Sequence, residues 1–389
     1  MIARAVRATL VTFFFAGFTV ASVLSRIPTI RDTLELSPTE MGHILFVGAL
    51  GSAAWLVLSG PVVAKIGVKR SVLICVAIWA LGLTLVIVSY AARSPWGLAV
   101  SLFVAQSGAG LWNSTMNIES GYVEVLGRKV RLPWYHAAFS FGTVSAALLG
   151  ALMIALTIPV VVHFILVLVI TVPLMIYATA GFIPDTVIGE IAASTEGATA
   201  RTRRAWRERL TILISLIPFA TGLLEGAAND WLALAMIDGF HAPAYWATAT
   251  LAFFLIVVTA TRIVAPRLRQ RVENSALLRR CLICAIIGVS FFAFAPWWPL
   301  ALIGVAGWGI GAALGFPAAA AALSRDPAMT AARLSVLSTI GYTAFLAGPP
   351  TLGYIAEHVG YRSALAVIVI PVVVATILTP TVREGRDIH

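Results

Sequence analysis

An acidic residue stands inside a long apolar run between residues 210 and 235. This residue, Glu225, follows Pro218 and Gly222 and precedes Asn229 at spacings of 4, 3 and 4, so all four share one face of a helix. A carboxyl in apolar surroundings can take up and release a proton or bind a polar solute. The alternative is a structural hydrogen bond between two helices. We predict that Glu225 handles a proton and that Asn229 contacts a solute.

A second polar stripe begins inside the apolar run at 96–119 and continues just beyond it. Its members, spaced by 7, 4, 3 and 4, are Gln106, Asn113, Asn117, Ser120 and Glu124. Amide side chains donate and accept hydrogen bonds, which suits neutral solutes that carry hydroxyl groups. Hydrogen bonding between helices is the alternative. We predict that Gln106, Asn113 and Asn117 contact a solute. Glu119 lies about 200° around the helix from Asn117, so it faces a neighbouring helix.

Three residues are candidates for a gate. Arg26 ends the first apolar run, and Asp230 follows Glu225 by five positions. An ion pair from Arg26 to Asp230 or Glu225 could close a passage; alternatively, the arginine snorkels and Asp230, beside a tryptophan, belongs to an interfacial anchor. His136 opens a later apolar run and could either titrate during function or pack against a loop. Thr19 shares a helical face with Arg26 and is a further candidate solute contact.

Other chemistry has little support in the sequence. No nucleotide-binding loop of the form Gly-x-x-x-x-Gly-Lys-Ser/Thr occurs, and no metal-ligand spacing stands out. Cys281-x-x-Cys284 has the spacing of a metal or redox pair, but two small apolar residues on one helix face fit these surroundings better. With Cys75 as the third cysteine, no disulfide framework is expected. We expect no cofactor, no metal, no catalytic residues and no enzyme activity.

The elements that carry these residues are strongly apolar. Of the 389 residues, 60% are apolar and only 11% are charged, and the mean hydropathy is +0.94. A typical soluble domain carries about a quarter charged residues, so this composition excludes a soluble globule. A disordered chain is excluded because such chains are poor in apolar residues. A polytopic membrane protein remains.

The number of spans follows from length, because a helix needs about 20 mostly apolar residues to cross a bilayer. Twelve runs of this kind are predicted, at 8–27, 40–64, 71–91, 96–119, 136–157, 159–183, 210–235, 243–265, 279–296, 298–323, 333–355 and 361–380. Arg4 and Arg7 precede the first run, which also suits a signal peptide, but the run is longer than the apolar part of one. We predict an all-α polytopic membrane protein with twelve transmembrane helices.

Basic residues collect on one side of the predicted membrane. With twelve spans, all 27 Lys and Arg residues fall on the side of the termini except Arg26, Arg31, Arg93 and Arg362. The positive-inside rule then places both termini in the cytoplasm. This bias explains the net charge of +10 without any nucleic-acid partner. It also assigns Arg262, near the end of the eighth run, to the cytoplasmic side.

The predicted spans divide into two halves. Residues 184–209 form the longest loop on the side of the termini and end in a basic run from Arg201, which fits a linker with a membrane-surface stretch. Motifs recur at an offset close to 200 residues: Gly108-x-Gly110 matches Gly309-x-Gly311, and Gly142 matches Gly341. We predict a six-helix bundle at 1–183, the linker at 184–209 and a second six-helix bundle at 210–389, the plan of parallel repeats.

With these features the chain resembles the major facilitator superfamily. The loop Gly60-Pro-Val-Val-Ala-Lys65-Ile-Gly67-Val-Lys69-Arg70 keeps the glycines and basic residues of that family's loop after span 2, with Ala64 at its acidic position. Gly348-Pro349-Pro350-Thr-Leu-Gly353 in span 11 resembles the family's Gly-Pro motif. Drug antiporters carry that motif in span 5, where this sequence has no proline. The resemblance implies that spans 1, 4, 7 and 10 line a central cavity.

A narrower resemblance is to the YbjJ-like inner-membrane proteins, distant relatives of a sugar-transporting fucose permease. It rests on Ser25-Arg26-Ile27-Pro28, Met116-Asn117, His136-x-x-Phe139-Ser140-x-Gly142 and Glu225-Gly226-x-x-x-Asp230-Trp231. It implies a proton-coupled secondary transporter of the bacterial inner membrane that moves a small polar solute, with sugar-like solutes as the first candidates, by alternating access.

Two alternatives stay open. Drug or metabolite efflux by proton antiport would keep the same fold. A membrane receptor or enzyme without transport fits less well, because no long extramembrane loop and no cluster of catalytic groups occurs. For the transporter we expect the solute, a proton and the lipid bilayer as partners, and a monomer.

Overall fold

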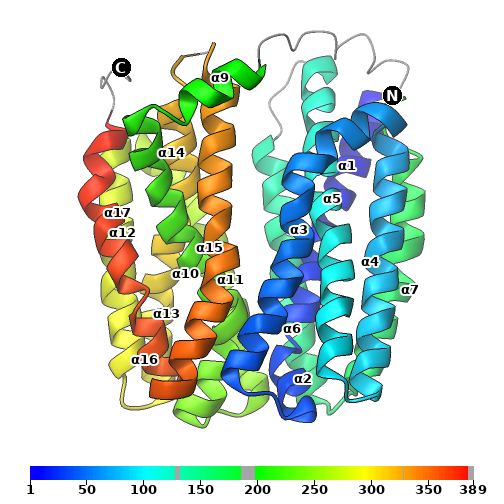
Figure 1. Cartoon of the computed structure of the whole chain (residues 1–389), viewed down its shortest axis with the longest axis vertical. Coiled ribbons are helices and arrows are strands. Elements are labelled where there is room, and N and C mark those ends of the chain that lie inside the picture. The colour runs from blue at the N-terminus through cyan, green and yellow to red at the C-terminus, as the bar shows by residue number, and fades with distance from the viewer. Residues whose placement is uncertain (128–131, 185–197, 327, 384–389) are drawn as a thin grey trace. The chain divides into compact units, whose positions relative to one another are not determined.

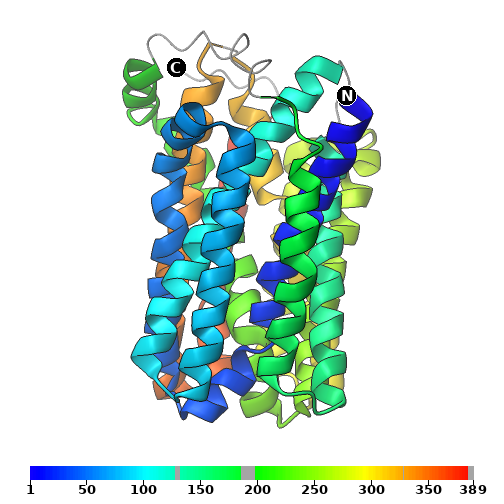
Figure 2. The same cartoon turned by 90° about the vertical axis from the view of Figure 1, so that its right-hand side faces the viewer.

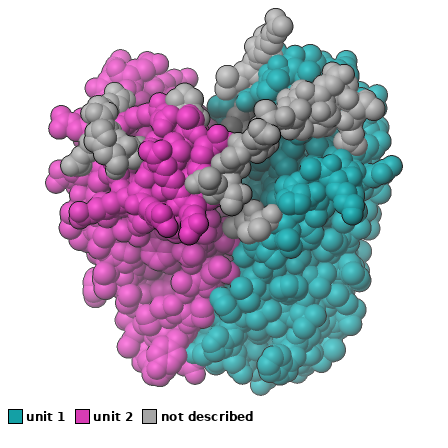
Figure 3. Space-filling model, turned by 45° about the horizontal axis from the view of Figure 1, so that its top comes forward, with its two compact units in different colours: residues 1–194, 244–252 teal, residues 195–243, 253–389 magenta. Residues whose placement is uncertain are grey.

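The computed structural model describes residues 1–127, 132–184, 198–326 and 328–383, and all regular structure in these ranges is helical (Figure 1). Contacts divide the chain into two compact units (Figure 3). Unit 1 is Met1–Ser194 with Ala244–Ala252, and unit 2 is Thr195–Pro243 with Phe253–His389. The division falls in the predicted linker, but it also groups the first turns of the eighth predicted span with unit 1.

Within the described residues of Met1–Ser194, unit 1 contains seven helices. Figure 2 draws them in blue through cyan to green. They are α1 (Ile2–Leu24), α2 (Ile27–Leu34), α3 (Pro38–Ile66), α4 (Val68–Ala91), α5 (Pro95–Gly127), α6 (Leu132–Ala155) and α7 (Val160–Thr179). Local sequence explains several boundaries. Ser37 and Glu40 form a capping box at the start of α3, and Gly67 separates α3 from α4 at a φ of 82°, a conformation that favours glycine.

Unit 2 contains the remaining helices. They are α9 (Ala198–Ala205), α10 (Arg209–Phe240), α11 (Ala244–Arg269), α12 (Asn274–Phe294), α13 (Trp298–Ala312), α14 (Gly315–Leu323), α15 (Thr330–Val359), α16 (Tyr361–Ala366), α17 (Val369–Leu378) and the 3₁₀ turn η1 (Thr379–Val382). The early turns of α11 belong to unit 1, where the Thr248 hydroxyl donates to the Ser25 carbonyl at 3.4 Å.

The twelve predicted spans are confirmed when α1–α2, α13–α14 and α16–α17 are each counted as one broken span. Nine of the described helices are long and apolar enough to cross a membrane, and ten if the bent α3 is included. The long helices α5 and α15 do not meet this composition criterion. Polar side chains such as Asn113, Asn117 and Glu119 lower the mean hydropathy of α5 below the criterion, although its length suffices to cross a membrane.

The two units use equivalent helix pairs. In unit 1, α1 packs on α6 and α4 on α5; in unit 2, α10 packs on α15 and α12 on α13. Gly142 of α6 lies against the Phe14 carbonyl of α1, and Gly341 of α15 lies against Pro218 of α10, as their predicted equivalence requires. Small residues at these contacts allow the backbones to approach closely.

The second predicted glycine match is shifted by two residues. Gly108 faces α4 at Trp79, and Gly110 faces α3 at Ser52. In unit 2, Gly309 faces α11 at Val257, whereas Gly307 and Gly311 both face α12. The predicted pair Gly309-x-Gly311 thus meets the two helices in the opposite order to Gly108-x-Gly110, and Gly307-x-Gly309 meets them in the same order. Glycines recur every two residues in this part of α13, so spacing alone could not select the register.

Candidate functional site

The centre of the candidate site is a broken helix in unit 2. Ala313 and Leu314 separate α13 from α14, and Pro317 follows in the first turn of α14. Proline has no N–H group, so it cannot donate to the carbonyl four residues earlier, which is that of Ala313. The Nε of Arg262 in α11 donates to this carbonyl at 3.2 Å instead. The helix is therefore broken next to Pro317, and a charged side chain supplies the missing donor.

The same arginine forms an ion pair with the predicted proton-handling residue. Arg262 NH2 lies 3.0 Å from Oε2 of Glu225, which is near the middle of α10. The two side chains are 37% and 28% exposed, respectively, so both are accessible. The predicted side of the membrane for Arg262 stays a prediction, and the structure adds a contact that the charge count did not indicate, with a mid-helix carboxylate. Sequence spacing could not pair residues on two different helices.

Surrounding contacts hold α10 against the break. Trp308 of α13 is buried and donates its indole N–H to the Leu224 carbonyl at 3.0 Å. Gly315, the first residue of α14, lies so close to Thr221 that a Cβ would overlap that side chain. Phe345 of α15, which is half-buried, packs beside Gly226. The residues of α10 on either side of Glu225 are therefore in contact with neighbouring helices.

Asn229 and Asp230 lie further along α10. Both are half-buried, and Asn229 Oδ1 has no hydrogen-bond partner among the described residues. The next residue, Trp231, is 1% exposed and packs against the Tyr361 ring with centroids 5.8 Å apart. Trp231 is thus a core residue rather than the interfacial anchor considered from sequence.

In unit 1, α5 brings the predicted amide pair together. Asn117 Nδ2 donates to the Asn113 carbonyl at 2.7 Å and approaches its Oδ1 at 3.3 Å. Asn113 is exposed and Asn117 is half-buried, so their amides remain accessible. Gln106 is half-buried beside Gly48 of α3. Glu119 is fully buried and accepts from the Ile183 backbone N–H at 3.0 Å, so it faces a neighbouring segment as predicted.

Two other predicted residues of unit 1 are engaged within the bundle. Thr19 is 1% exposed and its hydroxyl donates to the Ala16 carbonyl at 3.0 Å, which leaves no free surface for a solute. Arg26 is 2% exposed; its Nε donates to Nδ1 of His163 and its NH2 to the Ile158 carbonyl, each at 3.0 Å. The gate pair from Arg26 to Asp230 or Glu225 stays a prediction. The contact with His163 was not predicted, because this histidine is a single polar residue in an apolar run.

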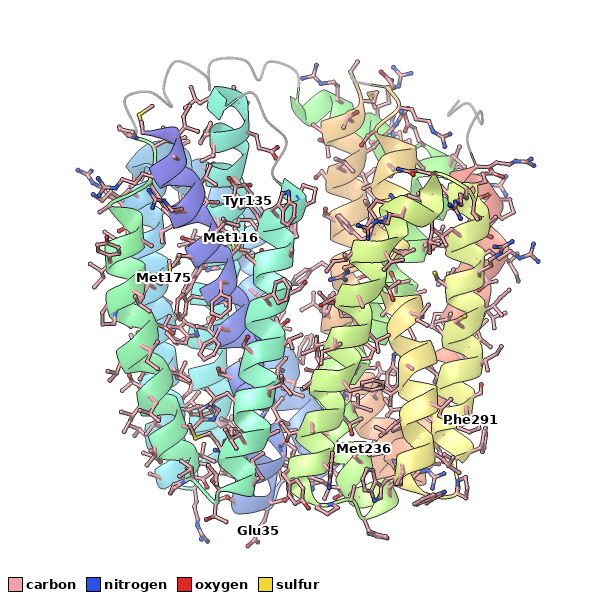
Figure 4. All side chains as sticks on the ribbon, turned by 180° about the vertical axis from the view of Figure 1, so that it is seen from behind. Glu35, Met116, Tyr135, Met175, Met236 and Phe291 are labelled. Carbon is pink, nitrogen blue, oxygen red and sulfur yellow. The ribbon has the colours of Figure 1, made fainter. Side chains whose placement is uncertain are left out.

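His136 lies at the start of α6. Its side chain is exposed, and the edge of its ring meets Phe13 of α1, with centroids 5.5 Å apart. The neighbouring Tyr135, labelled in Figure 4, is buried and stacks on the same phenylalanine, with ring centroids 5.5 Å apart. The His136 ring therefore packs against helix α1 rather than against a loop, and a titrating role stays a prediction.

A buried ion pair that the sequence did not predict links Glu208, just before α10, to Arg333 of α15. Arg333 places its Nε 2.7 Å from Oε2 and its NH2 3.1 Å from Oε1 of Glu208, a bidentate pair that is almost fully buried. Thr211 also donates to Glu208 at 2.7 Å. Burial acts to raise the pKa of the Glu208 carboxyl, but the hydrogen bonds from Arg333 and Thr211 and the charges of Arg333 and Arg204 outweigh it. Together they hold this pKa below its usual value.

The histidine, cysteine and acidic side chains were also compared with the requirements of a metal or redox site. Within the described ranges, no group of three or more His, Cys, Asp or Glu is placed to hold a metal ion. The cysteines Cys75, Cys281 and Cys284 are free, and the first two are buried.

Comparisons with known proteins agree with the fold. The sequence profile of the Major Facilitator Superfamily matches residues 9–331, so the chain belongs to this superfamily. The protein is therefore a multi-pass membrane transporter of this class.

Curated relatives share sequence over most of the chain. An uncharacterised MFS-type transporter of Yersinia pestis is 25% identical over 350 residues, which cover 90% of this chain and 88% of the relative. Membrane protein MosC of Rhizobium meliloti is 22% identical over 370 residues, 93% of this chain and 86% of the relative. The narrower resemblance to YbjJ-like proteins stays a prediction.

Solved structures share the fold at low identity. A mutant of the nucleoside transporter NupG superposes with a TM-score of 0.79 at 14% identity, covering 97% of this chain and 99% of that one. The Escherichia coli fucose:proton symporter FucP superposes with a TM-score of 0.68 at 16% identity, covering 98% and 99%. At such identities the likeness establishes the fold and leaves the solute open.

Proposed function

We propose that the protein is a proton-coupled secondary transporter that moves a small polar solute by alternating access of its two six-helix units. The observation that carries this proposal is the ion pair between Glu225 and Arg262 beside the α13–α14 break. Protonation of Glu225 would remove one charge of the pair and release one donor of Arg262. A proton-dependent contact next to a helix break is a device that can couple protonation to helix movement.

The solute contacts in the proposal are Asn113 and Asn117 of unit 1 and Asn229 of unit 2. Asn113 is exposed and Asn117 is half-buried, whereas the Asn229 Oδ1 is buried and has no hydrogen-bond partner among the described residues. Amides offer both donors and acceptors, which suits a neutral solute with hydroxyl groups. Solved neighbours of the same fold are named as nucleoside and fucose transporters, which supports this solute class by analogy. The basic bias of the loops supports cytoplasmic termini in a bacterial inner membrane.

The solute class can be found by thermal unfolding of the purified protein with sugars, nucleosides, carboxylates, amino acids and amphipathic drugs at two pH values. A ligand at 100 times its dissociation constant stabilises a protein by about 2.7 kcal/mol, which is measurable. We expect a polar solute whose stabilisation depends on pH. Stabilisation by amphipathic drugs alone would favour efflux by proton antiport instead.

The coupling role is tested by Glu225→Gln in proteoliposomes with the solute so identified. We expect loss of accumulation driven by a pH gradient, with solute exchange at equal pH retained, because the amide keeps hydrogen bonding but cannot titrate. Glu40→Gln is the matched control, because Glu40 lies in a capping box that glutamine also satisfies. Accumulation that survives Glu225→Gln would contradict the proposal.

A further inference from the structure

Four exposed arginines gather where α11 ends and α12 begins. They are Arg267, Arg271, Arg279 and Arg280, and none of them forms an ion pair within the described part of the chain. The acid of this connection, Glu273, is already paired with Arg383 at 3.4 Å. The described residues around this connection therefore carry an uncompensated positive charge.

On α11 these arginines extend an apolar surface. Ile263, Val264 and Leu268 are 49%, 43% and 42% exposed, and Arg267 and Arg271 follow Ile263 at steps of four residues. At 100° per residue, Arg267 lies about 140° around α11 from Arg262, and Arg271 follows two residues after the helix ends at Arg269. Because Arg262 contacts Glu225 of α10, Arg267 projects away from α10.

On α12 the same arrangement occurs with the helix running the other way. Arg279 and Arg280 precede Ile283 and Ile287 on one helical face, and these two are 40% and 63% exposed. The face continues to Phe291, which projects from the outer side of α12 (Figure 4). Leu278, Leu282 and other residues on the opposite face are buried.

On each of these two helices, an exposed apolar face leads to arginine side chains. Such a face can bind a single lipid molecule, with its acyl chains on the apolar part and its headgroup at the arginines. Acyl chains cover the isoleucine and leucine side chains, while guanidinium groups reach the phosphate, which they bind through two parallel hydrogen bonds. Basic clusters at this depth attract anionic headgroups. We propose that the ends of α11 and α12 form a binding surface for anionic phospholipid, separate from the Glu225–Arg262 site.

The test uses the full-length protein reconstituted in vesicles of phosphatidylcholine and phosphatidylglycerol in equal parts. After mild detergent extraction, native mass spectrometry counts the lipids of each kind that remain bound. We expect phosphatidylglycerol to be retained in preference to phosphatidylcholine, and the preference to fall as salt is raised. Equal retention of the two lipids by the unmodified protein would overturn the proposal, whatever any variant does.

A pair of variants locates the surface. R267Q/R271Q/R279Q/R280Q should lose the preference, by about fivefold for each arginine replaced. R201Q/R203Q/R204Q/R207Q removes the same charge from the basic run predicted to lie at the membrane surface. These arginines can attract headgroups, but α9 has only eight residues and presents no lipid-length apolar face that would retain a lipid through extraction. We expect this control to keep the preference. An equal loss in both variants would mean unspecific attraction by total charge and would contradict the proposal.

Discussion

Arg262 donates a hydrogen bond to the carbonyl that Pro317 leaves without a helical donor. Pro317 leaves the Ala313 oxygen without its helical donor, and Arg262 supplies one at 3.2 Å while it also binds Glu225 at 3.0 Å. One guanidinium thus satisfies a helix break and a carboxylate on another helix. Removing it would leave two acceptors short of a donor.

We therefore expect Arg262→Gln to lower the free energy of unfolding by about 1–3 kcal/mol. Arg262→Lys should recover only part of this loss, because an ammonium group lacks the fork that reaches both acceptors. Thermal unfolding in detergent measures both. The double variant E225Q/R262Q should be more stable than R262Q, since it no longer contains the unpaired carboxylate. A double variant less stable than R262Q would show that the two residues are not coupled.

The buried pair between Glu208 and Arg333 predicts a pH dependence of stability. The pKa of Glu208 is lower in the folded protein than its usual 4.5. The stabilisation is therefore fully present above about pH 4.5 and is lost as the pH falls through the lower, folded pKa. Thermal unfolding from neutral pH down to acid pH should show this loss. In E208Q/R333M the loss should be smaller, and an unchanged pH profile would assign it to other carboxylates.

Breaking the same pair on one side should be costly at neutral pH. Arg333→Met leaves the Glu208 carboxylate buried without its cation, so we expect a loss of about 3 kcal/mol in the free energy of unfolding. The double variant E208Q/R333M should be less affected. If R333M unfolds at the temperature of the parent protein, the pair contributes nothing to stability.

The contact between α1 and α6 predicts sensitivity to a single methyl group. A Cβ at Gly17 would overlap the Phe139 carbonyl, which is backbone and cannot rotate away. We expect Gly17→Ala to destabilise the protein by about 1–3 kcal/mol. Gly121→Ala is the control, because a Cβ there meets nothing within 4 Å and alanine favours a helix. Equal melting temperatures for the two variants would contradict the close packing.

The buried contact between Arg26 and His163 predicts a selective rescue. His163→Ala removes the acceptor of the Arg26 Nε in a site closed to water, so we expect a loss of about 1–3 kcal/mol. His163→Gln keeps an acceptor and should lose less. Thermal unfolding compares them, and a glutamine variant no better than alanine would show that ring packing, rather than the hydrogen bond, matters at this position.

Much of the architecture could be predicted from sequence because it depends on local quantities. Run length and apolar content located the spans, even α5 with its amides, and repeated motifs indicated two equivalent units. The helical stripe of Glu225 and Asn229, and that of Asn113 and Asn117, also followed from spacing alone, since periodicity determines which side chains share a face.

The contacts between side chains on different helices could not be predicted from spacing along the chain. Arg262 was counted with the loops, His163 was not singled out, and Glu208 was not paired with Arg333, which lies 125 residues further on. The sequence shows a proline at position 317, which breaks a helix, but the residue that donates to the freed Ala313 carbonyl is Arg262 of α11. The amino-acid sequence by itself determined that the chain spans a membrane in two halves and which residues share a helix face. Only the tertiary structure decided which charges meet, because an ion pair depends on helix packing and rotation, which no local periodicity specifies.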